Sequence, residues 1–282
     1  MSELKLIPPC SYQGGKQRLS KQIVDIIFKQ NNINNDTKFY DLCTGSGAVA
    51  LELINRGISP TNIIMVDIGV WGDFWVSIAN NEFDLSVFKK EIDKLPNINE
   101  IQNYLKIINK KPVDIELKLY HFLLQQAGSF GSKAIGIKDN KWINAGFRSY
   151  WLPTETSNRR SPVNPLMPMP ETLYKRMENI VNCLSGRVKA IQCDISNIEW
   201  EFSKNDIVYI DPPYKNTSKY YNEFDYESFI EKYNKFTNIY LSEGYEINNC
   251  TNSILLSKGR TKGNINGSSK KKPVEEWLNI YN

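Results

Sequence analysis

Short runs of apolar residues recur along the chain, and several of them end in an acidic residue or a turn. Seven of these runs predict β-strands, over Lys38–Leu42, Asn62–Asp67, Arg187–Gln192, Asp206–Asp211, Asn238–Ser242, Ser253–Ser257 and Glu276–Tyr281. The runs are nearly continuous in hydrophobicity rather than alternating, which is typical of strands covered on both faces of a sheet.

Apolar residues spaced by three or four positions predict helices between several of the strands. These helices are expected over Lys16–Phe28, Ala48–Arg56, Glu171–Leu184 and Tyr226–Phe236. Strands that alternate with helices favour a doubly wound, mostly parallel sheet, so we expect an α/β fold.

The alternation of strands and helices is interrupted in the middle of the chain. Helix-like patterns at Asp84–Leu95, Ile98–Ile108 and Asp114–Gln126 are followed by a glycine- and aromatic-rich stretch and then by a proline-rich one. We therefore expect a sheet domain formed by residues 1–70 and 171–282. Residues 71–170 are expected to form an inserted, largely helical and irregular lobe that positions a large substrate.

The composition is that of a globular protein. Of the 282 residues, 41% are hydrophobic and 23% are charged, and no apolar run approaches the roughly 20 residues that cross a bilayer. The N-terminus lacks the pattern of a signal peptide, so we expect a cytoplasmic location, in a bacterial or phage-infected cell. The five cysteines include no C-x-x-C pair and histidine occurs once, so no metal site is expected.

A glycine-rich turn, Asp41–Gly47 (DLCTGSG), lies between a predicted strand and a predicted helix. Gly45 and Gly47 permit a tight turn and close approach of a ligand to the backbone. Asp67 ends the next predicted strand, where an acid can accept hydrogen bonds from both ribose hydroxyls of an adenosine-containing cofactor. A plain turn and a capping acid are the alternative interpretation of each feature taken separately.

A second glycine motif, Tyr12–Lys16 (YQGGK), precedes a predicted helix near the N-terminus. Its two glycines let the chain pass close to a ligand, and Lys16 supplies a cation for a carboxylate. The start of the helix also presents N–H groups without helical partners. An ordinary loop is the alternative for this motif alone.

The hydrophobic run that starts at Asp206 ends in the sequence Asp211-Pro212-Pro213-Tyr214. Consecutive prolines fix φ and remove two backbone donors. The result is a stiff turn that displays a carboxylate, a carbonyl and an aromatic ring at the carboxyl edge of a sheet. Tyr214 can stack on a planar base, while the carboxylate of Asp211 and the carbonyl of Pro212 can each accept one hydrogen of its amino group.

Basic residues gather in two places, although the formal net charge is only +4. Residues 258–272 include six basic residues and no acid, and Arg148, Arg159 and Arg160 lie near aromatic residues. Positive charge beside flat side chains suits a nucleic-acid backbone and exposed bases. We expect nucleic-acid contacts from these arginines and from Lys258 and Arg260; a solvated loop is the alternative. The aromatic neighbours, which could instead form a small core, are Trp142, Phe147, Tyr150 and Trp151.

Taken in order, YQGGK, DLCTGSG, the strand end at Asp67, Cys193-Asp194 and DPPY resemble the motifs of the amino-methyltransferases that include the DNA adenine methylases. The resemblance covers about residues 8–68 and 188–214, and residues 275–282 show a weaker similarity. It does not extend through the central lobe. It implies a Rossmann-like methyltransferase fold, in which residues 71–170 form the target-recognition lobe. It further implies S-adenosylmethionine as the cofactor and the N6 amino group of adenine in DNA as the methyl acceptor.

The resemblance also implies roles for individual residues. Asp67 would hold the ribose, Asp194 would lie near the adenine edge of the cofactor, and Asp211 would bridge the cofactor and the target base. The cofactor-binding residues that it implies are Tyr12, Lys16, Asp41, Gly45, Gly47, Asp67, Asp194 and Asp211, and the catalytic ones are Asp211, Pro212 and Tyr214. Two positions depart from the family pattern, because Tyr12 replaces the usual tryptophan and Cys43 the usual phenylalanine.

Two acceptors on the amino hydrogens would direct the nitrogen lone pair toward the incoming methyl group and stabilise the developing positive charge. In double-stranded DNA, the base would have to be flipped out of the helix to reach Asp211. Three alternatives stay open at this point: transfer to N4 of cytosine, transfer to RNA, and a catalytically idle protein that binds the cofactor or DNA.

Overall fold

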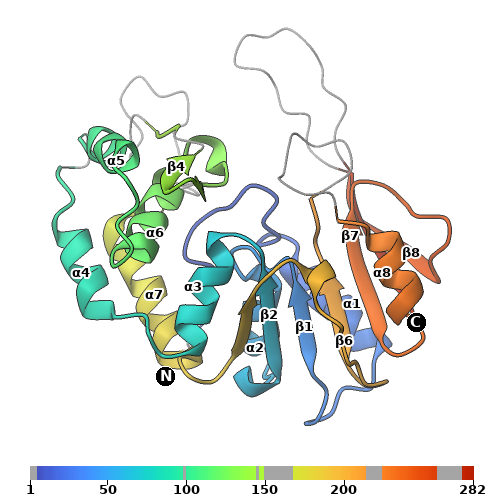
Figure 1. The fold of residues 1–282 in the computed structure, drawn as a ribbon. Coiled ribbons are helices and arrows are strands. Elements are labelled where there is room, and N and C mark those ends of the chain that lie inside the picture. Colours follow the sequence, from blue (N-terminus) through green and yellow to red (C-terminus); the bar gives the residue numbers. More distant parts are fainter. Residues whose placement is uncertain (1–4, 98–99, 144–145, 149–167, 214–223, 259–274) are drawn as a thin grey trace, which may run out of the picture.

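The computed structural model describes residues 5–97, 100–143, 146–148, 168–213, 224–258 and 275–282. Within these ranges, seven strands form one sheet in the order β5-β2-β1-β6-β7-β9-β8 (Figure 1). Neighbouring strands from β5 to β7 are parallel, whereas β9 is antiparallel to both β7 and β8. The strands are β1 (Phe39–Leu42), β2 (Ile63–Asp67), β5 (Lys189–Gln192), β6 (Ile207–Ile210), β7 (Asn238–Glu243), β8 (Asn252–Ser257) and β9 (Glu276–Tyr281). The predicted α/β fold with a mostly parallel sheet is confirmed.

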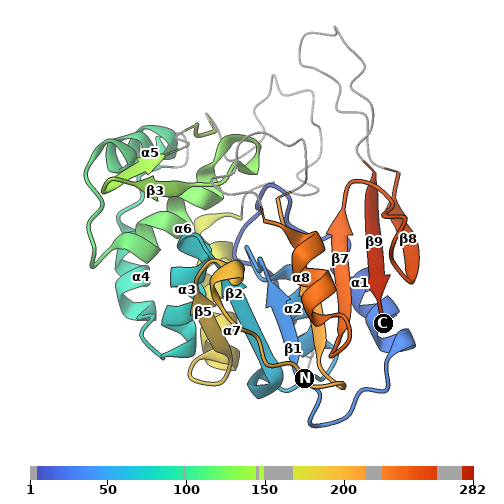
Figure 2. The same cartoon turned by 45° about the vertical axis from the view of Figure 1, so that its right-hand side comes forward.

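Helices cover the sheet on both faces, so that alternate residues of a strand, which point to opposite faces, are both buried. In β6, Ile207 and Tyr209 belong to one apolar cluster while Val208 and Ile210 belong to another. The first cluster takes in the buried faces of α1 (Ser20–Gln30), α2 (Ala48–Asn55), α3 (Val70–Ala79) and α7 (Pro170–Leu184), and the second takes in α8 (Tyr226–Tyr233). Figure 2 shows α8 in front of the sheet and α1 behind it.

The middle segment of the chain, which comprises the described residues 80–97, 100–143 and 146–148, lies beside α3 and α7 in both views of the fold (Figures 1 and 2). Its elements are α4 (Leu85–Asp93), α5 (Ile101–Lys110), α6 (Lys118–Gly128), a short helical turn at Phe130–Ser132 and a hairpin of β3 (Gly136–Lys138) and β4 (Lys141–Ile143). Its buried side chains, Phe88, Leu105 and Phe122 among them, belong to the same apolar cluster as one face of the sheet.

Helix α3 starts at Val70 and packs against β2 and β5, so this part of the predicted lobe covers the sheet. The division of the chain into residues 1–70 with 171–282 and an inserted lobe of residues 71–170 stays a prediction. Among the described helices, none has the length and apolar character needed to cross a membrane.

The strand order reverses between β1 and β6, because the chain continues from β1 toward β2 on one side and from β6 toward β7 on the other. In open α/β sheets, ligands bind outside the carboxyl ends of the strands at such a point. The backbone N–H of Asp211, just after β6, donates to the carbonyl of Leu42 at the end of β1, with an N–O distance of 3.3 Å. The turns predicted to carry the chemistry therefore adjoin this point.

Candidate active site

The glycine turn after β1 is held in place by a buried tryptophan. The indole N–H of Trp75 in α3 donates to the carbonyl of Gly45, with an N–O distance of 2.8 Å. Gly47 has a φ of 80°, and a Cβ atom there would lie 2.4 Å from Cζ2 of Trp75. Both the backbone conformation and the available space therefore require glycine at position 47.

Asp67 links this turn to the start of α3. Its Oδ2 accepts from the backbone N–H of Gly45 at 2.9 Å, and its Oδ1 accepts from that of Gly69 at 2.8 Å. Burial raises the pKa of Asp67 above its usual value, and the two backbone donors oppose that shift. The residue predicted to hold a ribose thus lies at the end of β2, directly beside the glycine turn.

Asp41 lies beneath the turn and is 3% exposed. Its Oδ2 accepts from the backbone N–H of Ala50 in α2, at 3.1 Å. Burial raises the pKa of Asp41 to about 8; the carboxylates of Asp211 and Asp67 add to the shift, while Ala50 and Lys16 oppose it. This carboxyl group therefore holds a proton at neutral pH. Its predicted contact with a cofactor stays a prediction.

Lys16 forms the centre of a charged cluster at the carboxyl edge of the sheet. Its Nζ lies 2.5 Å from Oδ1 of Asp211 and 3.3 Å from Oε1 of Glu276, and it donates to the carbonyl of Gly14 at 2.9 Å. Burial acts to lower the pKa of Lys16, but the two carboxylates outweigh it and raise the pKa overall. The structure thus brings Lys16 and Asp211 together, as two predicted site residues.

Glu276 is a site residue that the sequence analysis missed. It is the first residue of β9, and β9 is antiparallel to β7. A strand that runs in this direction begins at the edge where the parallel strands end, so Glu276 reaches the same edge as Asp211. The local sequence around Glu276 contains no signal for the direction of its strand.

Tyr12 lies over the glycine turn. A Cβ atom at Gly45 would lie 3.1 Å from Cε1 of Tyr12, and the Tyr12 ring meets that of Trp71 edge to face, with centroids 5.9 Å apart. The next residue, Gln13, donates its backbone N–H to the carbonyl of Ser132 at 2.7 Å. The N-terminal glycine motif therefore connects the sheet edge to the middle segment.

Four of the predicted acids act on the same thiol group, that of Cys43. Cys43 follows β1 with a φ of 66°. Burial raises the pKa of its thiol well above the usual value, and four carboxylates add to the shift. They belong to Asp67, Asp211, Asp41 and Asp194. Asp194 also accepts from the backbone N–H of Ser196, at 2.9 Å, just after β5.

The residues predicted to contact nucleic acid are only partly described. Tyr214, Arg159, Arg160 and Arg260 lie outside the described residues, as do Tyr150 and Trp151. Cζ of Arg148 lies 5.9 Å from the ring centroid of Phe130, and Lys258 is exposed just after β8. Nucleic-acid contacts from Arg148 and Lys258 stay predictions.

Two of the aromatic residues near these arginines are buried. Trp142 and Phe147 are each 6% exposed and belong to the large apolar cluster that also covers one face of the sheet. Their rings therefore pack inside the protein, which favours the alternative of a packing role for these two residues.

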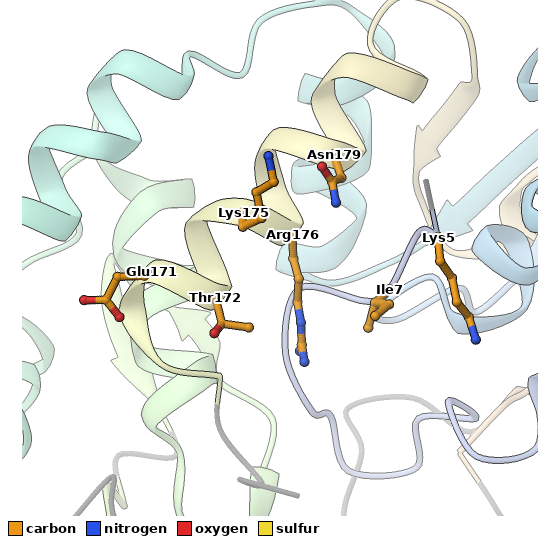
Figure 3. A pocket seen from close by; sticks show the side chains of 7 residues that line it. All are labelled: Lys5, Ile7, Glu171, Thr172, Lys175, Arg176 and Asn179. Carbon is orange, nitrogen blue, oxygen red and sulfur yellow. The ribbon is translucent and has the colours of Figure 1, made fainter. Parts of the chain in front are cut away.

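A cavity of about 390 Å³ lies away from the sheet edge, between the N-terminal segment and α7 (Figure 3). Its lining residues are Lys5, Ile7, Glu171, Thr172, Lys175, Arg176 and Asn179. None of them is a predicted site residue, and Arg176 is engaged by the carbonyls of Pro8 and Pro9, at 3.4 and 3.2 Å. We place the candidate site at the sheet edge, because the glycine turns, the acids and Lys16 converge there.

The comparison with protein families agrees with this placement. Residues 12–112 match the family described as D12 class N6 adenine-specific DNA methyltransferase. The matched segment contains both glycine motifs and Asp67, and it ends before β6 and the turn at Asp211. No curated protein matches the chain.

Proposed function

Because residues 12–112 match the family described as D12 class N6 adenine-specific DNA methyltransferase, we propose that the chain is an enzyme of this class and that the carboxyl edge of its sheet binds S-adenosylmethionine next to a flipped-out adenine. Enzymes of this family transfer a methyl group from S-adenosylmethionine to N6 of adenine in DNA. The observation that carries the proposal is the convergence of Asp67, the glycine turn and Asp211 at the point where the strand order reverses.

The residues at this edge fit an adenosine-containing cofactor. The turn at Gly45 and Gly47 leaves its backbone uncovered by Cβ atoms, and an acid stands at the end of β2. Each carboxylate oxygen of Asp67 accepts one backbone N–H, and a carboxylate oxygen has a second lone pair that can take a ribose hydroxyl. Tyr12 would cover the methionine side of the pocket, and Asp194 would lie near its adenine edge.

Asp211 and Pro212 would prepare the target amino group. The lone pair of an exocyclic amino nitrogen is delocalised into the ring, so the nitrogen is a poor nucleophile. Two acceptors on its hydrogens favour a tetrahedral nitrogen and stabilise the positive charge that develops there. The cofactor, when bound, supplies a methyl group on a positively charged sulfur, and Tyr214 would stack on the base. The base must leave the double helix to reach this turn.

The middle segment is proposed to select the DNA sequence. The hydrogen bond from Gln13 to Ser132 places the turn at Phe130–Ser132 beside the N-terminal glycine motif. Arg148, whose guanidinium lies near the ring of Phe130, is then close to the edge at which a flipped base would enter. A cytoplasmic location, where the enzyme meets DNA, is part of the proposal.

The test is methylation of mixed DNA and RNA with a labelled methyl donor, followed by nucleoside analysis. We expect the label in N6-methyl-deoxyadenosine. Asp211→Ala should lower turnover by about a hundredfold or more, whereas Asp93→Ala, at an exposed acid of α4, should retain it. Label in cytosine, or near-normal turnover by a folded Asp211→Ala variant, would overturn the proposed function.

A further inference from the structure

We propose that Glu276 is a positioning residue for methyl transfer, whose carboxylate balances the charge of Lys16 so that Asp211 keeps a net negative charge toward the target amino group. This inference rests on the function proposed above and adds a residue from the last described strand to its site. It also changes the expected role of Lys16.

Lys16 uses its hydrogen-bond donors on the protein itself. An ammonium group has three N–H donors, and the described acceptors around Nζ include Gly14 O at 2.9 Å, Asp211 Oδ1 at 2.5 Å and Glu276 Oε1 at 3.3 Å. The side chain is only 5% exposed, so solvent screens these contacts weakly. We therefore assign Lys16 to the carboxylate of Asp211 rather than to the carboxylate of a cofactor.

The backbone holds the three charged residues at the same place. The carbonyl of Lys16 accepts from the N–H groups of Leu19 and Ser20, at 2.8 and 2.7 Å, which fixes Lys16 in the turn just before α1. Asp211 follows β6 directly, and Glu276 begins β9, two strands away across β7. Since β7 and β9 pair in a fixed register, with Glu243 opposite Trp277, the position of Glu276 is set by the sheet.

Counted over these three described residues alone, the charges of Lys16, Asp211 and Glu276 add up to one negative charge. Asp211 and Glu276 contribute two carboxylates and Lys16 one ammonium group. Asp41, the nearby acid of β1, has a pKa raised to about 8 by burial and is neutral at pH 7. Burial raises the pKa values of Tyr209 and Cys43 well above their usual values, so these two groups are neutral as well.

The remaining negative charge matters for the reaction. The amino nitrogen becomes positive as it is methylated, and a negative group beside it stabilises that change. An isolated pair of Asp211 and Lys16 would be neutral overall, so its ammonium group would oppose the new positive charge. With Glu276 on the other side of Lys16, the ammonium group is balanced and Asp211 can act on the amino group.

The first test compares Glu276→Gln with Glu275→Gln in single-turnover methylation of DNA. Glu275 is exposed and accepts from Nε1 of Trp277 at 2.8 Å, so the control removes the same charge one position away. We expect Glu276→Gln to slow the methyl-transfer step by roughly tenfold or more, with the affinities for S-adenosylmethionine and DNA kept. Glu276→Asp, which keeps the charge, should retain most of the rate. Equal rates for Glu276→Gln and Glu275→Gln would overturn the inference.

The second test uses the pH dependence of the same rate, with circular dichroism to confirm the fold. The rate should fall on the acidic side of the profile as Asp211 takes up a proton. Lys16→Met removes a cation that favours the ionised form of Asp211, so this acidic limb should move to higher pH. Loss of the negative charge in Glu276→Gln should move that limb to lower pH while the plateau falls. A residue that only supported the fold would not move the two limbs in opposite directions, and shifts in the same direction would contradict the inference.

A double variant separates this inference from the proposed function. In the Lys16→Met background no ammonium group needs balancing, so Glu276→Gln should have little further effect on the rate. An undiminished effect there would show that Glu276 does not act through Lys16. If the wild-type protein fails to methylate adenine, the proposed function fails; if it methylates adenine and the Glu276 variants behave as wild type, this inference alone fails.

Discussion

The carboxyl edge of the sheet and the middle segment both bury acidic side chains, but they hold them differently. In the middle segment, Glu91 of α4 is 3% exposed and pairs with His121 of α6 at 3.1 Å and with Lys94 at 2.6 Å. Lys94 directly follows α4, whereas His121 belongs to α6 and so ties α4 to that neighbouring helix. At the carboxyl edge of the sheet, Lys16 contacts both Asp211 and Glu276, which lie far from it in the sequence. Charged side chains therefore support packing in one region and, on the function proposed above, chemistry in the other.

The largest expected effect tests whether the two regions share one core. Phe122 of α6 is fully buried, and its ring centroid lies 5.0 Å from that of Trp71 in α3. Phe122→Ala should destabilise the protein by about 3–5 kcal/mol, in a single urea transition followed by circular dichroism and tryptophan fluorescence. The matched control, Phe130→Ala, removes a ring that is 53% exposed and should cost less than about 0.5 kcal/mol. Two separate transitions would show that the middle segment folds on its own.

The next effect concerns the buried acid beneath the glycine turn. The pKa of Asp41 is about 8 in the folded protein, against 3.8 for the unperturbed group, so the folded state holds the proton over this range. Stability should therefore fall as pH rises from about 4 to 8, by at most about 1.4 kcal/mol per pH unit. Asp41→Asn removes the titration, so its stability relative to wild type should increase from pH 5 to pH 7 in urea denaturation. A constant difference between the two proteins would contradict this expectation.

A smaller effect is expected at the proposed cofactor pocket. Asp67→Ala removes the acceptors assigned to the ribose and should weaken binding of S-adenosylmethionine by about 1–3 kcal/mol in calorimetry. Asp73→Ala is the matched control, because Asp73 pairs with Lys118 of α6, at 2.9 Å, outside the cofactor pocket proposed here. Unchanged affinity in a folded Asp67→Ala variant would remove the ribose assignment and leave Asp67 as a structural link between two turns.

The smallest effect distinguishes recognition from packing in the middle segment. If Arg148 contacts a DNA phosphate, Arg148→Ala should reduce the slope of log affinity against log salt by about one unit for all DNA sequences. Arg187, an exposed arginine before β5, serves as the control and should leave that slope unchanged when replaced by alanine. Identical behaviour of the two variants would mean that the recognition surface does not include Arg148.

The strands were predictable because buried parallel strands are apolar at almost every position. Each of the seven predicted runs overlaps one strand of the large sheet, and five of them contain that strand completely, while β7 and β8 extend one residue further. Helix α3 was not predicted, because its sequence, VWGDFWVSIA, is apolar on nearly all sides and includes Gly72. Only glycine fits at position 72, because a Cβ atom there would lie 2.1 Å from the carbonyl oxygen of Asp67. Close packing against the end of β2 thus overrides local helix propensity.

The position of candidate site residues was predictable at the carboxyl ends of parallel strands, where Asp67 and Asp211 lie. It was not predictable where a contact depends on the pairing of distant strands. The helix predicted from Lys16 begins at Ser20 instead, after a turn that places Lys16 against Asp211. Glu276 depends on the antiparallel direction of β9, which follows from its neighbours in the sheet rather than from its own sequence.

The position of β9 has a consequence for synthesis on the ribosome. Because β9 lies between β7 and β8 in the sheet but follows both in the chain, a nascent chain that has emerged only through β8 cannot complete the sheet. Chains fold from the N-terminus as they emerge, so the glycine turns and β6 can assemble before Glu276 leaves the exit tunnel. On the charge balance proposed above, such an incomplete chain would carry Asp211 and Lys16 as a neutral pair, and methyl transfer would stay slow until β9 is inserted.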